Sequence, residues 1–340
     1  MRSLSRALAW LLLAGAVAVS AAAWMTRQEL QRVAVAGADR AFSVAPGTSL
    51  RTVLNELSAQ QLLRHPHLIE AWSRWQYGAR PGLKSGNYVF AHGSTARDLI
   101  EQLRQGRVVL EQITLIEGWN FGQFRHALDT HPAVTHAWRA ESGEAVMSML
   151  GTPGVHPEGR FFPDTYRFAA GTADSAVYRM AHERMQQELA AAWQQRAPDS
   201  QLTSPDQLLI FASLVEKETA REDERGRVAG VFANRLRIGM RLQSDPTVIY
   251  GLGDHYDGDI RSRDLVTDTP YNTYTREGLP PTPISMPGAA SLRAAAHPDE
   301  TRALYFVATG NGDGTHHFSA TLEEHNAAVA SFLRRQKARR

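Results

Sequence analysis

The chain has 340 residues, of which 43% are hydrophobic and 21% charged, a balance typical of a folded globular protein. Its 37 lysines and arginines nearly match its 35 aspartates and glutamates, so the net charge of +2 gives no argument for a nucleic-acid partner. The chain has no cysteine, which excludes disulfides, thiolate metal ligands and a cysteine nucleophile.

The N-terminal region contains an uncharged run, rich in alanine, leucine and valine, from Ala7 to Trp24. Its length is close to the roughly 20 residues that cross a bilayer, which predicts a transmembrane anchor at 7–24 after a cytoplasmic tail at 1–6. The alternative is a cleaved signal peptide, because Ala21–Ala23 offers small residues for cleavage. Either interpretation places the rest of the chain outside the cytoplasm.

The segment 25–41 is polar and is expected to be a linker. Beyond it, strand-like segments meet glycine turns, capping residues and apolar helical periods, which predicts alternating strands and helices. The expected strands are Phe42–Val44, Gly86–Phe90 and Gln112–Ile116. The mixture predicts the α+β fold class.

Longer helical patterns follow. Asp174 is the expected N-cap of a helix ending near Ala197, and Ser204 caps a helix at 205–220 that has proline at its first position. The stretch 131–154 lacks a clear period and is expected to be a surface insertion. Residues 239–287 are rich in Gly, Pro, Asp and Tyr and are expected to be mainly loop. The remaining helices are expected at 224–238, 291–296 and 322–337, and a strand at 304–308.

The stretch from Glu158 to Tyr166 is dense in aromatic residues. Aromatic rings fill hydrophobic cores, and they also stack on sugars. The sequence leaves both interpretations open, a hydrophobic plug or a sugar-stacking wall.

Two acids, Glu216 and Glu218, end the apolar helix predicted at 205–220. Helical geometry places the apolar centre roughly 55° from Glu218 and roughly 105° from Glu216. Glu218 therefore continues the buried face, where burial would raise its pKa and suit it to general-acid chemistry. The structural alternative is that Glu218 only pairs with Arg221 or caps a neighbouring element.

Loops after residue 239 supply hydroxyls, amides and flat rings, which together fit a hydroxyl- and acetamido-rich ligand such as an amino sugar. Pro246 biases the first of these segments toward an extended form. The structural alternative is ordinary turn chemistry. The candidate sugar-binding residues are Gln243, Ser244, Asp245, Asn272 and Tyr274.

The sequence lacks the HExxH, P-loop, GxGxxG and GxSxG motifs, so neither a metal nor a cofactor is expected. His316-His317 lacks the spaced partners of a metal site and is interpreted as a surface pair.

The run from Ala212 to Gly251, with Tyr271–Tyr274, Gly278-Leu279-Pro280-Pro281 and Ala294–Pro298, closely resembles the MltG (YceG-like) endolytic murein transglycosylases. The resemblance also takes in Gly159–Tyr166. It implies a catalytic domain at 112–340. A weaker likeness from about Phe42 implies a LysM-like subdomain at 42–111.

The resemblance implies a single-pass protein of the bacterial inner membrane, with its catalytic domain in the periplasm. It would cleave glycan strands of peptidoglycan between N-acetylmuramic acid and N-acetylglucosamine and leave 1,6-anhydro ends. The family's catalytic glutamate falls on Glu218. Penicillin-binding synthases are implied as partners, together with a role in terminating nascent strands.

Two alternatives remain. One is a muramidase that uses water and has Asp245 as its second carboxylate; the other is a non-catalytic glycan-binding scaffold for cell-wall synthases. In the transglycosylase reading Glu216 is not needed as a proton carrier, so we expect it to hold structure through a contact outside its helix.

Overall fold

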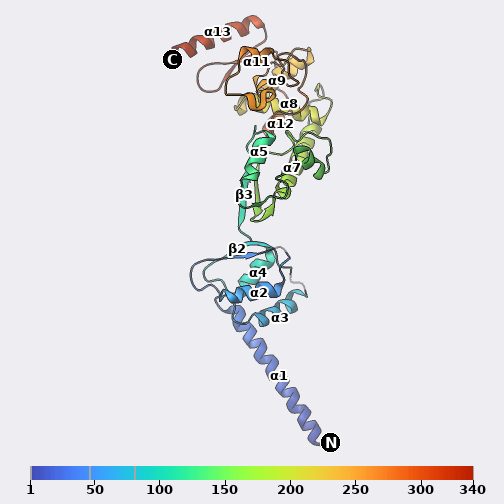
Figure 1. The fold of residues 1–340 in the computed structure, drawn as a ribbon, viewed down its shortest axis with the longest axis vertical. Coiled ribbons are helices and arrows are strands. Elements are labelled where there is room, and N and C mark those ends of the chain that lie inside the picture. The colour runs from blue at the N-terminus through green and yellow to red at the C-terminus, as the bar shows by residue number, and fades with distance from the viewer. Residues whose placement is uncertain (1, 46, 80–81, 340) are drawn as a thin grey trace. The chain divides into compact units, whose positions relative to one another are not determined.

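The computed structural model describes residues 2–45, 47–79 and 82–339, and the chain divides into two compact units (Figure 1). The first unit comprises Met1–Glu111 with Arg167–Thr172, and the second comprises Gln112–Tyr166 with Ala173–Arg340. Each unit has its own hydrophobic core, and the mixture of helices and short strands confirms the α+β class.

The first unit packs its helices around a two-stranded antiparallel sheet of β1 and β2. Phe42 pairs with Tyr88 across this sheet, and both side chains are buried in the core. The N-terminus of α4 is closed by a capping box, in which the Thr95 hydroxyl and the Asp98 carboxylate accept each other's backbone N–H groups. The elements are α1 (Arg2–Gln31), β1 (Arg40–Val44), α2 (Leu50–Ala59), α3 (Pro66–Tyr77), β2 (Gly86–Phe90) and α4 (Ala96–Gln105).

The segment expected to be a linker instead belongs to this unit. Helix α1 continues through Gln31, and Leu30 and Val35 are buried in the core. The expectation was wrong because the mainly polar segment 25–41 also contains a few apolar side chains, and α1 packs these against α3 and α4. Helix α3 was not predicted.

Beyond α4 the chain forms three further two-stranded sheets and a group of packed helices. Strand β3 pairs with β5, β4 with β6, and β7 with β8. The remaining elements are β3 (Leu110–Thr114), α5 (Phe121–Asp129), β4 (Val134–Thr135), α6 (Gly143–Met149), β5 (Thr165–Ala169), β6 (Thr172–Ala173), α7 (Asp174–Gln194), α8 (Pro205–Glu218), α9 (Glu222–Arg237), α10 (Asp245–Leu252), η1 (Gly253–His255), α11 (Ser262–Val266), α12 (Ala289–Ala296), β7 (Tyr305–Ala308), β8 (His316–Ser319) and α13 (Leu322–Arg339).

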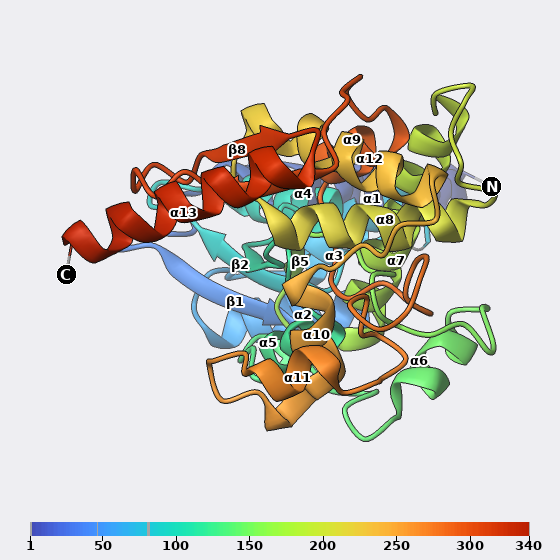
Figure 2. The ribbon, with the colours of Figure 1, turned by 90° about the horizontal axis from the view of Figure 1, so that it is seen from above.

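Helix α8 is the central helix of the second unit, in contact with α7, α9, α10 and α12 (Figure 2). Every residue from Leu208 to Val215 is buried. As predicted, the Ser204 hydroxyl caps the helix by accepting the Gln207 N–H, and Pro205 stands at the first helical position. Burial on all sides fixes the end of α8, which carries the two acids.

Three local predictions were wrong. Asp174 lies inside α7, where its carboxylate accepts the N–H groups of Ser175, Ala137 and Trp138. The stretch 131–154 contains α6, which buries Val146 in the core. Pro246 is the second residue of α10 and does not extend the chain, because proline is accommodated in the first turn of a helix.

Candidate active site

Glu218 is the last residue of α8 and is partly buried, at the point where the chain leaves the helix. The next residue, Thr219, is buried and extended, with φ −142° and ψ 132°. The rigid helix and this abrupt exit hold the carboxylate at a fixed place beside the loop that precedes α10.

Ser244 is the direct partner of Glu218. Its hydroxyl donates a hydrogen bond of 3.0 Å to Glu218 Oε2. Ser244 is 1% exposed, and its own N–H donates to Thr273 Oγ1 at 3.0 Å. The neighbouring Gln243 N–H donates to the Thr273 carbonyl at 3.1 Å. The loop before α10 is thus hydrogen-bonded to the 271–274 segment, and this pairing positions the hydroxyl against the carboxylate.

Burial raises the pKa of Glu218 to about 7. The Ser244 hydrogen bond opposes this shift in pKa, the negative charge of Asp245 adds to it, and the positive charge of Arg235 opposes it. Among the described residues no hydrogen bond reaches Glu218 Oε1. The group can therefore hold or release a proton near neutral pH, with one oxygen available to a ligand.

Three of the five predicted sugar-binding residues lie around Glu218. Besides Ser244, these are Asp245, which is exposed, and Tyr274, whose hydroxyl donates to Asp245 Oδ1 at 2.5 Å. The pKa of Tyr274 is raised, first by burial and then by this bond to Asp245.

The other two predicted residues differ. Gln243 is exposed and has a left-handed φ of 51°, and its Oε1 accepts a long hydrogen bond of 3.5 Å from Arg235 Nη1. Asn272 is 1% exposed, and its amide donates to the carbonyls of Asp264, Leu265 and Thr267. Its amide is engaged by its own loop, which favours a supporting role over sugar contact.

Glu216 makes the contact outside its helix that was expected of it. Its Oε2 accepts the Gly288 N–H at 2.9 Å, and Gly288 is the N-cap residue of α12. A carboxylate at a helix N-terminus satisfies a free donor and interacts favourably with the helix dipole. Glu216 therefore joins the end of α8 to α12.

Glu158 is a second buried acid that the sequence analysis did not single out. It is 3% exposed, and both of its oxygens accept the Phe121 N–H, at 3.0 and 3.2 Å. The Tyr250 hydroxyl also donates to Oε2 at 3.0 Å. Burial raises the pKa of Glu158 to about 7, against the lowering effect of these hydrogen bonds. Its partners lie 37 and 92 residues away, so no local signal marked it.

Glu158 lines a cleft of about 1110 Å³ that is bounded by the N-terminal end of α5, α10 and Tyr271. Tyr250 and Tyr271 form an edge-on aromatic pair in its wall, with ring centroids 4.8 Å apart. Lys217, the residue before Glu218, also faces the cleft and donates to the Gly118 carbonyl at 3.3 Å. Flat rings and polar groups around such a volume suit a sugar.

The aromatic residues of 158–166 are core residues. Phe161 is fully buried, and its ring packs against those of Phe121, Phe124 and Tyr178, at centroid distances of 5.5, 5.0 and 5.6 Å. The hydrophobic-plug interpretation is therefore confirmed, and the sugar-stacking wall at these residues was wrong. The aromatic wall of the cleft comes from Tyr250 and Tyr271 instead.

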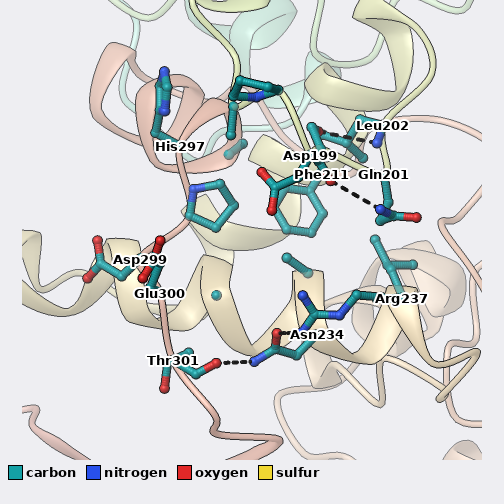
Figure 3. Close-up of a pocket in the computed structure, with 18 residues that line it drawn as sticks. Asp199, Gln201, Leu202, Phe211, Asn234, Arg237, His297, Asp299, Glu300 and Thr301 are labelled. Atoms are coloured by element: carbon teal, nitrogen blue, oxygen red, sulfur yellow. Dashed lines mark hydrogen bonds between the residues drawn. The ribbon is translucent and has the colours of Figure 1, made fainter.

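A separate hollow of about 480 Å³ lies between the 197–202 loop, α9 and the segment 297–301 (Figure 3). Asn234 on α9 donates to the Thr301 carbonyl at 2.8 Å along its edge. A side chain at Gly230 would meet the Asp299 carbonyl at 2.5 Å, which explains the glycine in this helix. Glu218 does not line this hollow.

Within the described residues no group of three His, Cys, Asp or Glu side chains is arranged to hold a metal ion. His316, expected in a surface pair, is mostly buried, and its Nδ1 lies 2.7 Å from Glu224 Oε2. Glu224 also accepts the His316 N–H at 3.0 Å, so this contact ties β8 to α9.

Known proteins resemble this chain over most of its length. The profile of the YceG-like family matches residues 42–331, so the chain belongs to the YceG-like family. An endolytic murein transglycosylase of Bacillus subtilis (strain 168) is 29% identical over 309 residues, which cover 86% of this chain and 84% of that protein.

Two further relatives agree. The endolytic murein transglycosylase of Streptococcus pneumoniae serotype 2 (strain D39 / NCTC 7466) is 25% identical over 322 residues, which cover 85% of this chain and 58% of that longer protein. The crystal structure of a YceG-like protein from Listeria monocytogenes has a TM-score of 0.54 and 27% identity, and the match covers 85% of this chain and 98% of that one.

Proposed function

We propose that this chain is an endolytic murein transglycosylase, a lyase that cleaves peptidoglycan glycan strands internally. The name shared by the Bacillus and Streptococcus relatives supports this activity. The observation that carries the chemistry is the environment of Glu218, a carboxyl group with a pKa raised to about 7, one hydroxyl partner and a free oxygen.

Protonated Glu218 first donates its proton to the glycosidic oxygen as the bond between N-acetylmuramic acid and N-acetylglucosamine breaks. An oxocarbenium-like centre forms at C1 of the muramic acid. Ionised Glu218 then takes the proton from the C6 hydroxyl of the same sugar while that oxygen attacks C1, which gives the 1,6-anhydro product.

One carboxyl group suffices for this sequence because the nucleophile belongs to the substrate. The Ser244 hydroxyl supports the ionised form of Glu218 between the two proton transfers. Asp245, Tyr274 and Gln243 are assigned to sugar binding at the open side of the site, and Asn272 to support of the loop.

A muramidase is the alternative, because the negative charge of Asp245 acts on Glu218 and adds to the rise in its pKa. In that reaction Asp245 would assist a water molecule or stabilise the sugar cation. One oxygen of its carboxylate, Oδ1, instead accepts the Tyr274 hydroxyl at 2.5 Å, which supports the transglycosylase.

The membrane anchor, the cellular location and the partners of the enzyme are also proposed. Helix α1 contains a segment, Trp10–Gln31, that is long and apolar enough to cross a membrane, with a mean hydropathy of 1.4. We assign the uncharged run 7–24 of this helix as a single-pass inner-membrane anchor that leaves the catalytic unit in the periplasm. Residues 42–111 are assigned as a LysM-like subdomain, penicillin-binding synthases as partners, and termination of nascent strands as the cellular role.

The decisive experiment compares the full-length protein with its Glu218→Gln variant on purified sacculi, with mass spectrometry of the released glycans. The proposal expects 1,6-anhydro ends from the wild type and none from the variant. Reducing muramic acid ends would identify a muramidase. Equal cleavage by both proteins would remove Glu218 from the chemistry, and no cleavage by either would favour the scaffold.

A further inference from the structure

A groove in the first unit runs along the C-terminal half of α1, where this helix meets α3 and the first turn of α4. Its volume is about 890 Å³. The groove combines apolar residues of α1 with tryptophans of α3 and two arginines, and the lining residues in the described chain include no carboxylate. The lining residues include Val19, Ala23, Arg27, Ala71, Trp75 and Arg97.

Trp75 is exposed to an unusual degree. It is 81% exposed, more than Trp10 at 69% and Trp24 at 63%, which lie on the apolar helix itself. Such a large exposed ring in water is unfavourable, but the boundary between lipid and water suits tryptophan, which has an apolar body and a polar N–H. Arg97 adds a positive charge on the same side, and its guanidinium lies 5.5 Å from the ring centre of Trp72.

The depth of Trp75 follows from the geometry of α1. The 20 uncharged residues between Arg6 and Arg27 form one uninterrupted helix. At a rise of about 1.5 Å per residue they span about 30 Å, the thickness of a bilayer's hydrocarbon core. All of this stretch is needed to cross the membrane, so its outer boundary falls near Arg27.

Val19 and Ala23 lie one to two turns below that boundary, yet they line the same groove as Trp75 and Ala71 of α3. Helix α1 continues into the core of the first unit, where Leu30 is buried, so no flexible segment separates the span from this unit. The exposed side of α3 must therefore reach the membrane surface wherever α1 crosses the membrane.

We propose that the first unit docks on the phospholipid interface through this groove, with Trp75 at the depth of the ester region and Arg27 and Arg97 facing lipid phosphates. The inference rests on the proposed anchoring by α1. Continuity with the span and the basic, carboxylate-free lining favour lipid over a second copy of the chain or a partner's transmembrane helix.

The absence of cysteine allows a clean test, because one introduced cysteine carries one fluorophore. An environment-sensitive NBD label is placed at Ala71→Cys in the groove, with Trp72 and Trp75 intact. Two control positions carry the same label. Val17→Cys lies within the span, where Val17 is 61% exposed, and it reports whether the helix is anchored. Val89→Cys lies on β2, at the other end of this unit from α1 (Figure 1), where Val89 is 40% exposed, and it reports the background far from the groove. Full-length proteins are placed in phosphatidylethanolamine–phosphatidylglycerol vesicles that contain nitroxide-labelled lipid.

The proposal expects quenching at position 71 to be several-fold stronger than at 89 and weaker than at 17. Quenching at 17 but equal, weak quenching at 71 and 89 would overturn the docking and leave the anchor intact. Weak quenching at all three positions would overturn both. A blue-shifted but unquenched label at 71 would indicate contact between copies of the chain and would also overturn the proposal.

A second variant separates Trp75 from the rest of the groove. Trp75→Gln in the Ala71→Cys background changes only an exposed side chain, so the fold is expected to persist. Quenching at position 71 should fall, because the ring no longer holds α3 at the interface. Unchanged quenching would remove Trp75 from the contact.

Discussion

Two carboxyl groups of the second unit, those of the partly buried Glu218 and the buried Glu158, both have a pKa raised to about 7, but their surroundings differ. Glu218 has one hydroxyl partner and a free oxygen beside exposed polar residues. Both oxygens of Glu158 are occupied by a backbone N–H and a tyrosine hydroxyl. A raised pKa alone therefore does not distinguish the two acids, whereas the free oxygen of Glu218 beside exposed polar residues supports the proposal that it is the catalytic acid.

The largest expected effect is a difference in turnover between variants of Glu218 and Glu158. Glu218→Gln removes the proton donor, and loss of general acid–base catalysis lowers turnover by about 10²–10⁴-fold. Glu158→Gln keeps acceptor and donor atoms for Phe121 and Tyr250, so we expect turnover within a few-fold of wild type. Release of anhydro-muropeptides from sacculi measures both, and circular dichroism controls for folding. Equal losses in the two variants would make Glu158 part of the chemistry.

The next effect concerns stability and pH. A carboxyl group whose pKa is raised on folding, as for Glu158, keeps its proton in the folded state while the unfolded chain has released it. The contribution of this group to the free energy of unfolding therefore falls by up to about 3 kcal/mol as pH rises from about 4.5 to about 7. Above about pH 7 this contribution is constant. Glu158→Gln removes that contribution.

Urea unfolding of wild type and Glu158→Gln at pH 5 and pH 8 measures the change. The free energy of unfolding of the variant should rise relative to wild type between the two pH values, because the other titrating groups, Glu218 included, cancel in the comparison. A constant difference would mean that Glu158 has an ordinary pKa.

Glu216 provides a smaller effect on the same helix end. Glu216→Ala removes the acceptor for the Gly288 N–H at the start of α12, and loss of such a cap costs about 0.5–2 kcal/mol. Turnover per folded molecule should stay near wild type because Glu216 carries no proton in the reaction. Thermal unfolding and the sacculus assay measure the two quantities; a large loss of turnover in a stable variant would contradict the structural role.

The contrast between the acids also explains what the sequence could predict. Helix α8 and the bias of Glu218 toward its buried side follow from local signals, the Ser204 cap and the apolar run. The partner Ser244 was nominated by residue type, but its bond to Glu218 depends on the pairing of its loop with Thr273. Glu158 had no local signal, because residues far along the chain create its environment.

The same reasoning applies to the helices that the sequence did not predict. Helix α10 begins in a segment rich in turn-forming residues, and the Thr247 hydroxyl, which donates to the Ser244 carbonyl at 2.6 Å, supports its first turn. The end of α1 is stabilised by burial of Leu30 within the first unit. A local side-chain hydrogen bond supports the helix in the first case and tertiary burial supports it in the second, and in both cases the composition pointed the other way.

The smallest expected effects are shifts of the pH optimum, which should have opposite signs for variants of Ser244 and Asp245, the two neighbours of Glu218. Ser244→Ala removes a hydrogen bond that lowers the pKa of Glu218, so the pKa rises and the pH optimum of cleavage moves up. Asp245→Asn removes a negative charge that raises the same pKa, so the optimum moves down. Turnover on sacculi from pH 5 to pH 9 measures both shifts.

Because one variant should move the pH optimum up and the other should move it down, a loss of stability shared by both variants cannot produce the same result.

The Asp245→Asn variant also distinguishes the transglycosylase reaction from the muramidase reaction. A transglycosylase loses only the contribution of one sugar contact, whereas a muramidase that uses Asp245 as its second carboxylate would lose about 10²-fold or more. A severe loss of turnover with an unchanged pH optimum would therefore mean that Asp245 takes part in the reaction and does not merely shift the pKa of Glu218.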